Sequence, residues 1–150
     1  MKAKVNWIEN FKLEGHTDTG KIVNMDSGIN ASAASPAQLI LQALAGCTMM
    51  DCILILTKGR KHINRFWVNV DAEEAESHPK IFKRIRLEYN FESETLNHAD
   101  AERAIKLSEE KYCRVRAMLN CSSEITSSFK IYNHKESEKE VIPEYLEICV

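Results

Sequence analysis

Residues 35–59 read SPAQLILQALAGCTMMDCILILTKG, and this stretch decides the fold of the chain. Ser35 predicts a helix N-cap, Pro36 suits the first turn, and Gln38 completes a capping box. Gly59 predicts the end of the helix, because glycine adopts the left-handed conformation easily. The residues between are apolar on nearly every face, so we expect one long helix that is buried all round.

Period-two alternation on both sides of this helix predicts β-strands. The expected strands lie at residues 4–8, 11–14, 21–25, 65–73, 81–91 and 123–131. The two strands that follow the helix form a long antiparallel hairpin, with one face toward the core and one toward water.

A second helix is predicted to begin after Asn97, which is a favourable N-cap residue. An apolar stripe at helical spacing continues to Val115 and includes Tyr112, whereas Glu109 falls on the face expected to contact solvent. Cys113 belongs on the buried side of this helix.

The order of these elements predicts an α+β fold, with mostly antiparallel sheets wrapped around the long central helix and the second helix beside it. Residues 1–133 are expected to form one domain, and residues 134–150 a C-terminal tail that is partly charged. One protomer has too little sheet to cover the central helix on every side. We therefore expect an intertwined homodimer in which two such helices pair.

Charge, apolar content and cysteine count limit the classes of partner and site that we expect for this chain. The net charge of -2 gives no electrostatic case for binding nucleic acid. The apolar stretch is near the length of a membrane span, but it contains Gln42 and Asp51, so we expect a soluble core helix and no membrane association. The five cysteines and the absence of an apolar leader predict free thiols in the cytoplasm. The sequence has no CxxC or HxxxH spacing, and we expect neither a metal nor a cofactor.

Cys47 and Cys113 are the candidate catalytic residues, since each is expected at a buried position of a helix. A thiolate can attack a peroxide and become a sulfenic acid, and a second thiol then condenses with it to a disulfide. Buried cysteine is also common as a small apolar residue, so packing is the alternative that the residues alone favour. Cys52, Cys121 and Cys149 receive no role.

Other residues of the central helix are candidates for the pocket around Cys47. We expect Asp51 either to face a polar cleft or to pair with a cation, such as Lys58 or one from the partner subunit, because an isolated buried charge is costly. Leu44, Met49 and Met50 are expected to line an apolar pocket that favours alkyl substrates.

Two segments resemble the cysteine motifs of the OsmC/Ohr family. Ser35 to Cys47, followed by Lys58-Gly59-Arg60, is similar to the family's first-cysteine helix, and residues 108–115 are similar to its second-cysteine motif. The order of elements agrees over about residues 1–133. Within the family, the chain most resembles the OsmC-like, YhfA-type branch.

The resemblance implies an obligate, intertwined homodimer with two active sites at the subunit interface. It implies that Cys47 is the peroxidatic thiol and Cys113 the resolving thiol. It also implies reduction of small hydrophobic organic hydroperoxides, with electrons from a dithiol such as a lipoyl group.

Two positions depart from the pattern of the family's peroxidases. The glutamate that follows the proline there is Ala37 here, and no arginine precedes Arg60. Candidates for supporting the thiolate or lining its pocket are Lys12, His16, Lys21, Ala37 and Gln38, although a lysine lacks the planar fork of arginine. These departures keep two alternatives to a peroxidase, namely a non-catalytic dimeric binding module for a small hydrophobic ligand and a redox sensor.

Overall fold

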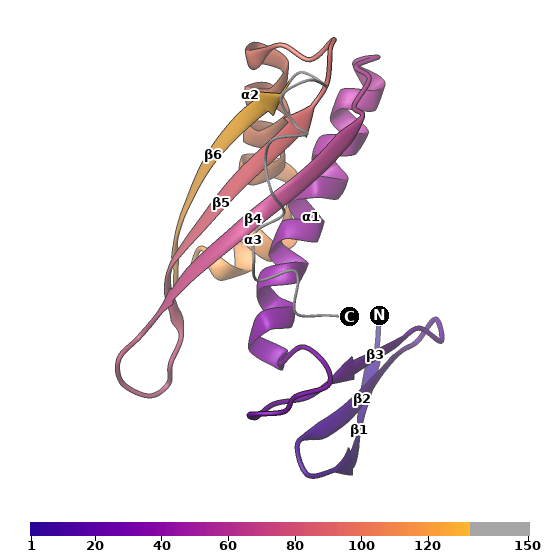
Figure 1. Cartoon of the computed structure of the whole chain (residues 1–150), viewed down its shortest axis with the longest axis vertical. Coiled ribbons are helices and arrows are strands. Elements are labelled where there is room, and N and C mark those ends of the chain that lie inside the picture. The colour runs from indigo at the N-terminus through magenta and orange to yellow at the C-terminus, as the bar shows by residue number, and fades with distance from the viewer. Residues whose placement is uncertain (133–150) are drawn as a thin grey trace. The chain divides into compact units, whose positions relative to one another are not determined.

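The structure, a computed structural model, describes residues 1–132 (Figure 1). The tail predicted from residue 134 and Cys149 lie outside the described residues. The chain divides into two compact units, one of residues 1–43 and one that begins at Leu44.

The first unit contains an antiparallel sheet in the order β1-β2-β3. Its strands are β1 (Ala3–Glu9), β2 (Lys12–Thr17) and β3 (Ile22–Met25). The three predicted strands are confirmed, but β2 continues through Gly15, which pairs with Val5 and Val23. A side chain at Gly15 would crowd the Met25 methyl group, which lies 3.2 Å from the place of a Cβ atom, so a glycine suits this strand.

The long helix α1 extends over Pro36–Lys58, as predicted. The capping box is also confirmed, because the Ser35 N–H donates to Gln38 Oε1 at 2.8 Å and the Gln38 N–H donates to Ser35 Oγ at 3.3 Å. The predicted left-handed Gly59 is wrong. Arg60 takes that conformation instead, with φ 55°, since the helix closes one residue later than expected.

Within this chain, α1 is buried along only one stripe. Leu44, Thr48 and Cys52 are fully buried at a spacing of four residues, whereas Met50 is 73% and Leu54 is 54% exposed. One chain therefore leaves much of α1 uncovered, as expected from the small amount of sheet in one protomer, and burial of the other faces by a second chain stays a prediction. In residues 1–132, α1 is the only helix whose length and hydropathy would suit a membrane span.

The second unit contains a sheet in the order β4-β5-β6. Its strands are β4 (Arg65–Glu74), β5 (Phe82–Glu92) and β6 (Glu124–Tyr132). The predicted hairpin is confirmed, and Phe66 lies opposite Phe91 and Val70 opposite Leu87. β6 instead runs parallel to β5, because the helices between them return the chain to the same end of the sheet.

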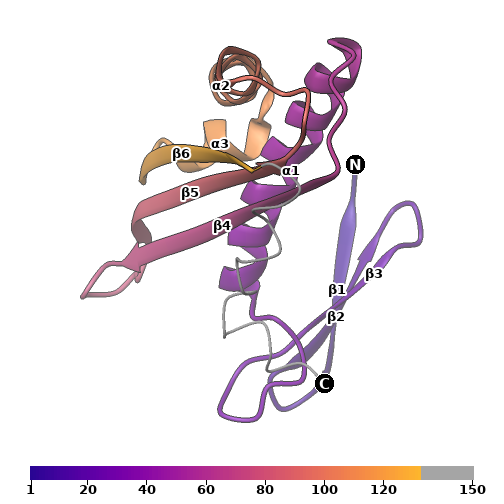
Figure 2. The same cartoon turned by 45° about the horizontal axis from the view of Figure 1, so that its top comes forward.

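Two helices and a π-helical segment replace the single second helix that was predicted. They are α2 (His98–Leu107), η1 (Ser108–Tyr112) and α3 (Arg114–Leu119). Asn97 caps α2, as predicted, by accepting from the Asp100 N–H at 2.9 Å. Figures 1 and 2 show these helices and the second-unit part of α1 along one face of the sheet.

The π-helical segment changes which side chains face the core. A π-turn holds an extra residue, so the positions after it are rotated relative to a continuous α-helix. Tyr112, which was predicted to be buried, is 49% exposed. The Glu109 side chain, which was predicted to contact solvent, is only 14% exposed. Cys113 is buried as predicted, but it lies between two helices instead of inside one.

Candidate functional site

The two candidate thiols meet in the second unit. The Sγ atoms of Cys47 and Cys113 and one carboxylate oxygen of Asp51 all lie within 4.8 Å of one another. α1 supplies Cys47 and Asp51, which share a helix face because they are four residues apart. The junction of η1 and α3 supplies Cys113. The fold thus brings together two thiols that are 66 positions apart in the sequence (113 less 47).

Asp51 is held in place by a hydrogen bond. Its Oδ2 atom accepts from the Ser108 hydroxyl at 2.9 Å, and Ser108 is fully buried. Asp51 and Lys58 both line a cavity of about 440 Å³, but no ion pair joins them among the described residues. Of the two predicted environments for Asp51, the structure supports the polar cleft.

Cys113 acts as the N-cap of α3. Its Sγ atom accepts a hydrogen bond from the Arg116 N–H at 3.3 Å. Burial is the main cause that raises the pKa of the Cys113 thiol to about 12, and its hydrogen bond with Cys47 acts in the same direction. The Arg116 N–H partly opposes this rise. Cys113 is therefore a protonated thiol at neutral pH.

The remaining described cysteines differ from this pair in exposure. Cys47 is half-buried, so a small molecule has better access to it than to Cys113. Cys52 is fully buried, and burial raises its pKa to about 12, which makes it an inert packing residue. Cys121 is exposed, and its thiol donates to the Ala117 carbonyl at 3.6 Å.

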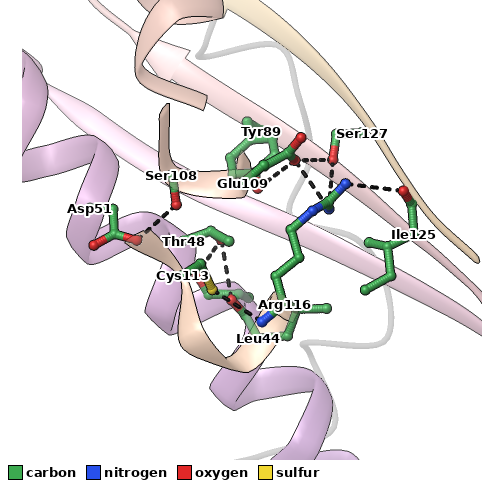
Figure 3. A network of polar contacts seen from close by, with 11 residues as sticks. Leu44, Thr48, Asp51, Tyr89, Ser108, Glu109, Cys113, Arg116, Ile125 and Ser127 are labelled. Atoms are coloured by element: carbon green, nitrogen blue, oxygen red, sulfur yellow. Dashed lines mark hydrogen bonds and ion pairs between the residues drawn. The ribbon is translucent and has the colours of Figure 1, made fainter. Parts of the chain in front are cut away.

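A buried ion pair anchors the segment that carries Cys113 (Figure 3). The Arg116 guanidinium lies 3.2 Å from Glu109, and the two side chains are 13% and 14% exposed. Arg116 also donates to the Ile125 carbonyl at 3.1 Å. Glu109 accepts from the Tyr89 hydroxyl at 3.3 Å and from the Ser127 hydroxyl. The network links β5, η1, α3 and β6.

Sequence reasoning missed this network. Glu109 and Arg116 are seven residues apart, a spacing that places two residues on the same side of a helix, and this was the available signal. The partners Tyr89 and Ser127 come from β5 and β6. The parallel pairing of these strands was not predicted, so these contacts could not be expected from the sequence.

The predicted supports in the first unit have partners of their own. Lys12 pairs with Glu9 at 3.0 Å, and His16 pairs with Glu14 at 2.5 Å. Lys21 is exposed immediately before β3, and Ala37 is exposed in the first turn of α1. The Gln38 side chain is used in the capping box.

The apolar pocket predicted around Cys47 from Leu44, Met49 and Met50 includes residues of a partner chain, and it stays a prediction. Within one chain, Leu44 is fully buried and Met50 is mostly exposed. The cavity of about 440 Å³ is a separate feature, and its apolar wall is formed by Leu54, Ile55, Leu56 and Leu107.

Comparisons with known proteins agree with this fold. Residues 29–128 match the family of OsmC-like proteins. Protein YhfA of Escherichia coli K12 is 34% identical over 131 residues, which span 87% of this chain and 98% of YhfA.

Two solved structures show the same architecture. The OsmC-like protein of Mycoplasma pneumoniae superposes with a TM-score of 0.76 at 15% identity, over 87% of this chain and 95% of that one. The organic hydroperoxide resistance protein OhrB of Bacillus subtilis superposes with a TM-score of 0.60 at 17% identity, over 87% and 98%. The predicted family and its α+β fold are confirmed, and the chain belongs to the family of OsmC-like proteins.

Proposed function

We propose that this protein is a thiol-dependent peroxidase that reduces organic hydroperoxides, with Cys47 as the attacking thiol and Cys113 as the resolving thiol. The observation that carries the proposal is the approach of the two sulfur atoms to within 4.8 Å from separate elements. Structural similarity to proteins named for organic hydroperoxide resistance supports the substrate class.

The reaction proceeds in two steps. The Cys47 thiolate attacks one oxygen of the peroxide, the O–O bond breaks, and the other oxygen leaves as an alcohol after taking a proton. Cys47 is then a sulfenic acid. Cys113 attacks its sulfur, water leaves, and a disulfide forms at an S–S distance of about 2.05 Å. A dithiol, such as a lipoyl group, reduces the disulfide and restores both thiols.

The environment of the two thiols supports this division of roles. Cys47 is half-buried and within reach of a small hydrophobic peroxide, whereas Cys113 is 3% exposed. The raised pKa of Cys113 keeps it protonated, so it is a poor attacking thiol in the first step and its proton can leave with the sulfenic acid oxygen as water in the second. A protonated buried thiol suits the second step better than the first.

We also propose that the protein is an intertwined homodimer in the cytoplasm, with α1 of each chain packed against the other. Met50, Ile53 and Leu54 are 73%, 46% and 54% exposed in the single chain. Each such side chain contributes about 1.5–3 kcal/mol when it is fully buried. A second copy of the chain offers the same apolar surface, so the two α1 helices can cover each other. The cytoplasm is proposed because its reducing conditions keep cysteine thiols free.

The dimer is tested by sedimentation. At micromolar concentration we expect the mass of two chains, and we expect Leu54→Glu to shift the protein toward one chain because the charge would be buried at the interface. Ile81→Glu serves as the control, because Ile81 is an apolar residue that is 46% exposed and lies outside the proposed α1 interface. A wild-type protein with the mass of one chain would contradict the dimer.

A binding module for a small hydrophobic ligand is the second candidate. The observation that favours it is the cavity of about 440 Å³, which combines an apolar wall with the cationic residues Lys58, Lys61 and Arg103. Such a module retains its ligand when Cys47 is replaced. A redox sensor, the third candidate, forms the same disulfide as the peroxidase but turns over slowly.

The proposed reaction is tested by mapping the oxidised protein. Reduced protein is treated with one equivalent of an alkyl hydroperoxide, remaining thiols are blocked, and peptides are analysed by mass spectrometry. We expect a Cys47–Cys113 disulfide, with Cys52 and Cys121 recovered as blocked thiols. Recovery of neither this disulfide nor a Cys47 sulfenic acid would sink the proposal.

A further inference from the structure

The carboxylate of Asp51 has no role in the peroxidase reaction, and its position next to two thiols is unfavourable for that reaction. A negative charge close to a thiol disfavours the thiolate. Within residues 1–132, the Ser108 hydroxyl is the hydrogen-bond partner of Asp51, and no cation forms an ion pair with it. Three groups that can each carry a negative charge thus converge within 4.8 Å. A cation between them would remove the repulsion.

We propose that Cys47, Asp51 and Cys113 bind Zn²⁺ in the reduced protein, as a site with three protein ligands and an open fourth position. Two thiolates and a carboxylate are ligands that Zn²⁺ accepts, and a water molecule commonly fills the fourth position of such sites. Metal binding goes beyond the proposed peroxidase activity and does not depend on it.

The spacing of the donor atoms fits a zinc ion after a small contraction. With sulfur at about 2.3 Å and oxygen at about 2.0–2.2 Å from zinc, the donors of a tetrahedral site lie about 3.5–3.8 Å apart. Here all three lie within 4.8 Å of one another without a metal. Cys47 and Asp51 have the i, i+4 spacing by which one helix face offers two metal ligands.

Hydrogen bonds from a second layer of residues already orient the ligands. The Ser108 hydroxyl donates to Asp51 Oδ2 and so fixes the direction of the carboxylate, whose oxygens can accept a hydrogen bond and bind a metal together. The Arg116 N–H donates to Cys113 Sγ. Donors of this kind are typical of metal sites, where they fix the ligand orientation and tune affinity.

The metal site and the disulfide exclude each other, because both use the same two sulfur atoms. An organic hydroperoxide and two protons convert the zinc dithiolate into a disulfide, an alcohol, water and free Zn²⁺. The two sulfurs lose two electrons in all, and the O–O bond takes them up. Only Asp51 then remains as a ligand, so the metal leaves. This coupling, unlike metal binding itself, rests on the proposed function.

The test is a titration of the full chain, reduced and freed of metal by a chelator, with Co²⁺ as a spectroscopic substitute for Zn²⁺. At one Co²⁺ per chain we expect sulfur-to-cobalt charge-transfer absorption for two thiolates and the visible bands of a tetrahedral site, and we expect Zn²⁺ to bleach both. Asp51→Asn, which keeps an acceptor for Ser108, and Cys113→Ser should each weaken binding at least about tenfold, and Ser108→Ala by about tenfold.

Control variants separate this site from other thiols. Cys52→Ala and the double variant Cys121→Ser/Cys149→Ser should keep the wild-type absorption. The proposal is overturned if cobalt gives no charge-transfer absorption, if the Cys121/Cys149 variant loses it, or if Cys47→Ser/Cys113→Ser retains it. Peroxide consumption measured with chelator present tests the peroxidase separately, so failure of one proposal is distinguishable from failure of the other.

Discussion

Replacing Cys47 by serine is expected to reduce peroxide consumption to the rate without protein. A serine hydroxyl is a far weaker nucleophile than a thiolate and does not form a sulfenic acid, so the first step is lost. We expect a fall of at least about a thousandfold in kcat/KM, as is usual when an attacking group is removed. The rate of consumption of an alkyl hydroperoxide with an excess of a dithiol measures the effect.

Two further variants make this result specific. Cys113→Ser should consume about one equivalent of peroxide and then stop with Cys47 as sulfenic acid, because resolution is lost. This variant should fold, since serine is a preferred N-cap residue for α3. Cys52→Ala removes a buried thiol of the same helix and should keep the wild-type rate. Equal rates of peroxide consumption for Cys47→Ser and wild type would contradict the proposed role of Cys47. The binding module would be favoured if the wild-type protein had no peroxidase activity and Cys47→Ser still bound a small hydrophobic ligand.

Local chemistry explains the parts of the fold that the sequence predicted well. The capping box of Ser35 and Gln38 and the N-cap at Asn97 depend on residues three positions apart. The face of β5 that holds Ile85, Leu87 and Tyr89 follows from period-two alternation. These signals lie within a few residues and do not need the rest of the chain.

The incorrect predictions concern features that depend on distant contacts. A continuous helix was the simplest interpretation of residues 98–115, but buried contacts to β5 and β6 favour the π-turn at η1. The parallel pairing of β6 follows from the path of the intervening helices.

The candidate site could be predicted in part. Cys47 and Cys113 emerged from the motif resemblance, and the structure places their sulfur atoms together. The contact of Asp51 with Ser108 could not be predicted, because it joins residues 57 positions apart in the sequence. The cap from the Arg116 N–H to Cys113 could not be predicted either, because it depends on the break between η1 and α3. A cysteine is also an unusual N-cap, so the sequence did not mark the break.

Replacing Arg116 by methionine is expected to lower the free energy of unfolding by about 3–5 kcal/mol, the usual cost of leaving one partner of a buried ion pair without the other. Glu109 would remain 14% exposed with only the hydroxyls of Tyr89 and Ser127 to satisfy it. Methionine keeps the stem volume and the backbone N–H that caps Cys113, so the loss reports the charge. Urea unfolding at one fixed protein concentration measures it, since dimer stability depends on concentration.

A double-mutant cycle then separates the ion pair from general damage to the core. Glu109→Gln alone should also be destabilising, and Glu109→Gln/Arg116→Met should lose less than the sum, because neither buried charge is left unpaired. The exposed pair of Arg84 and Glu73, at 2.7 Å, is the matched control, and Arg84→Met should cost less than about 1 kcal/mol because water screens it. If Arg116→Met and Arg84→Met cost the same, Arg116 does not anchor the Cys113 segment, and its contacts with Glu109 and the Ile125 carbonyl add no more than a surface pair would.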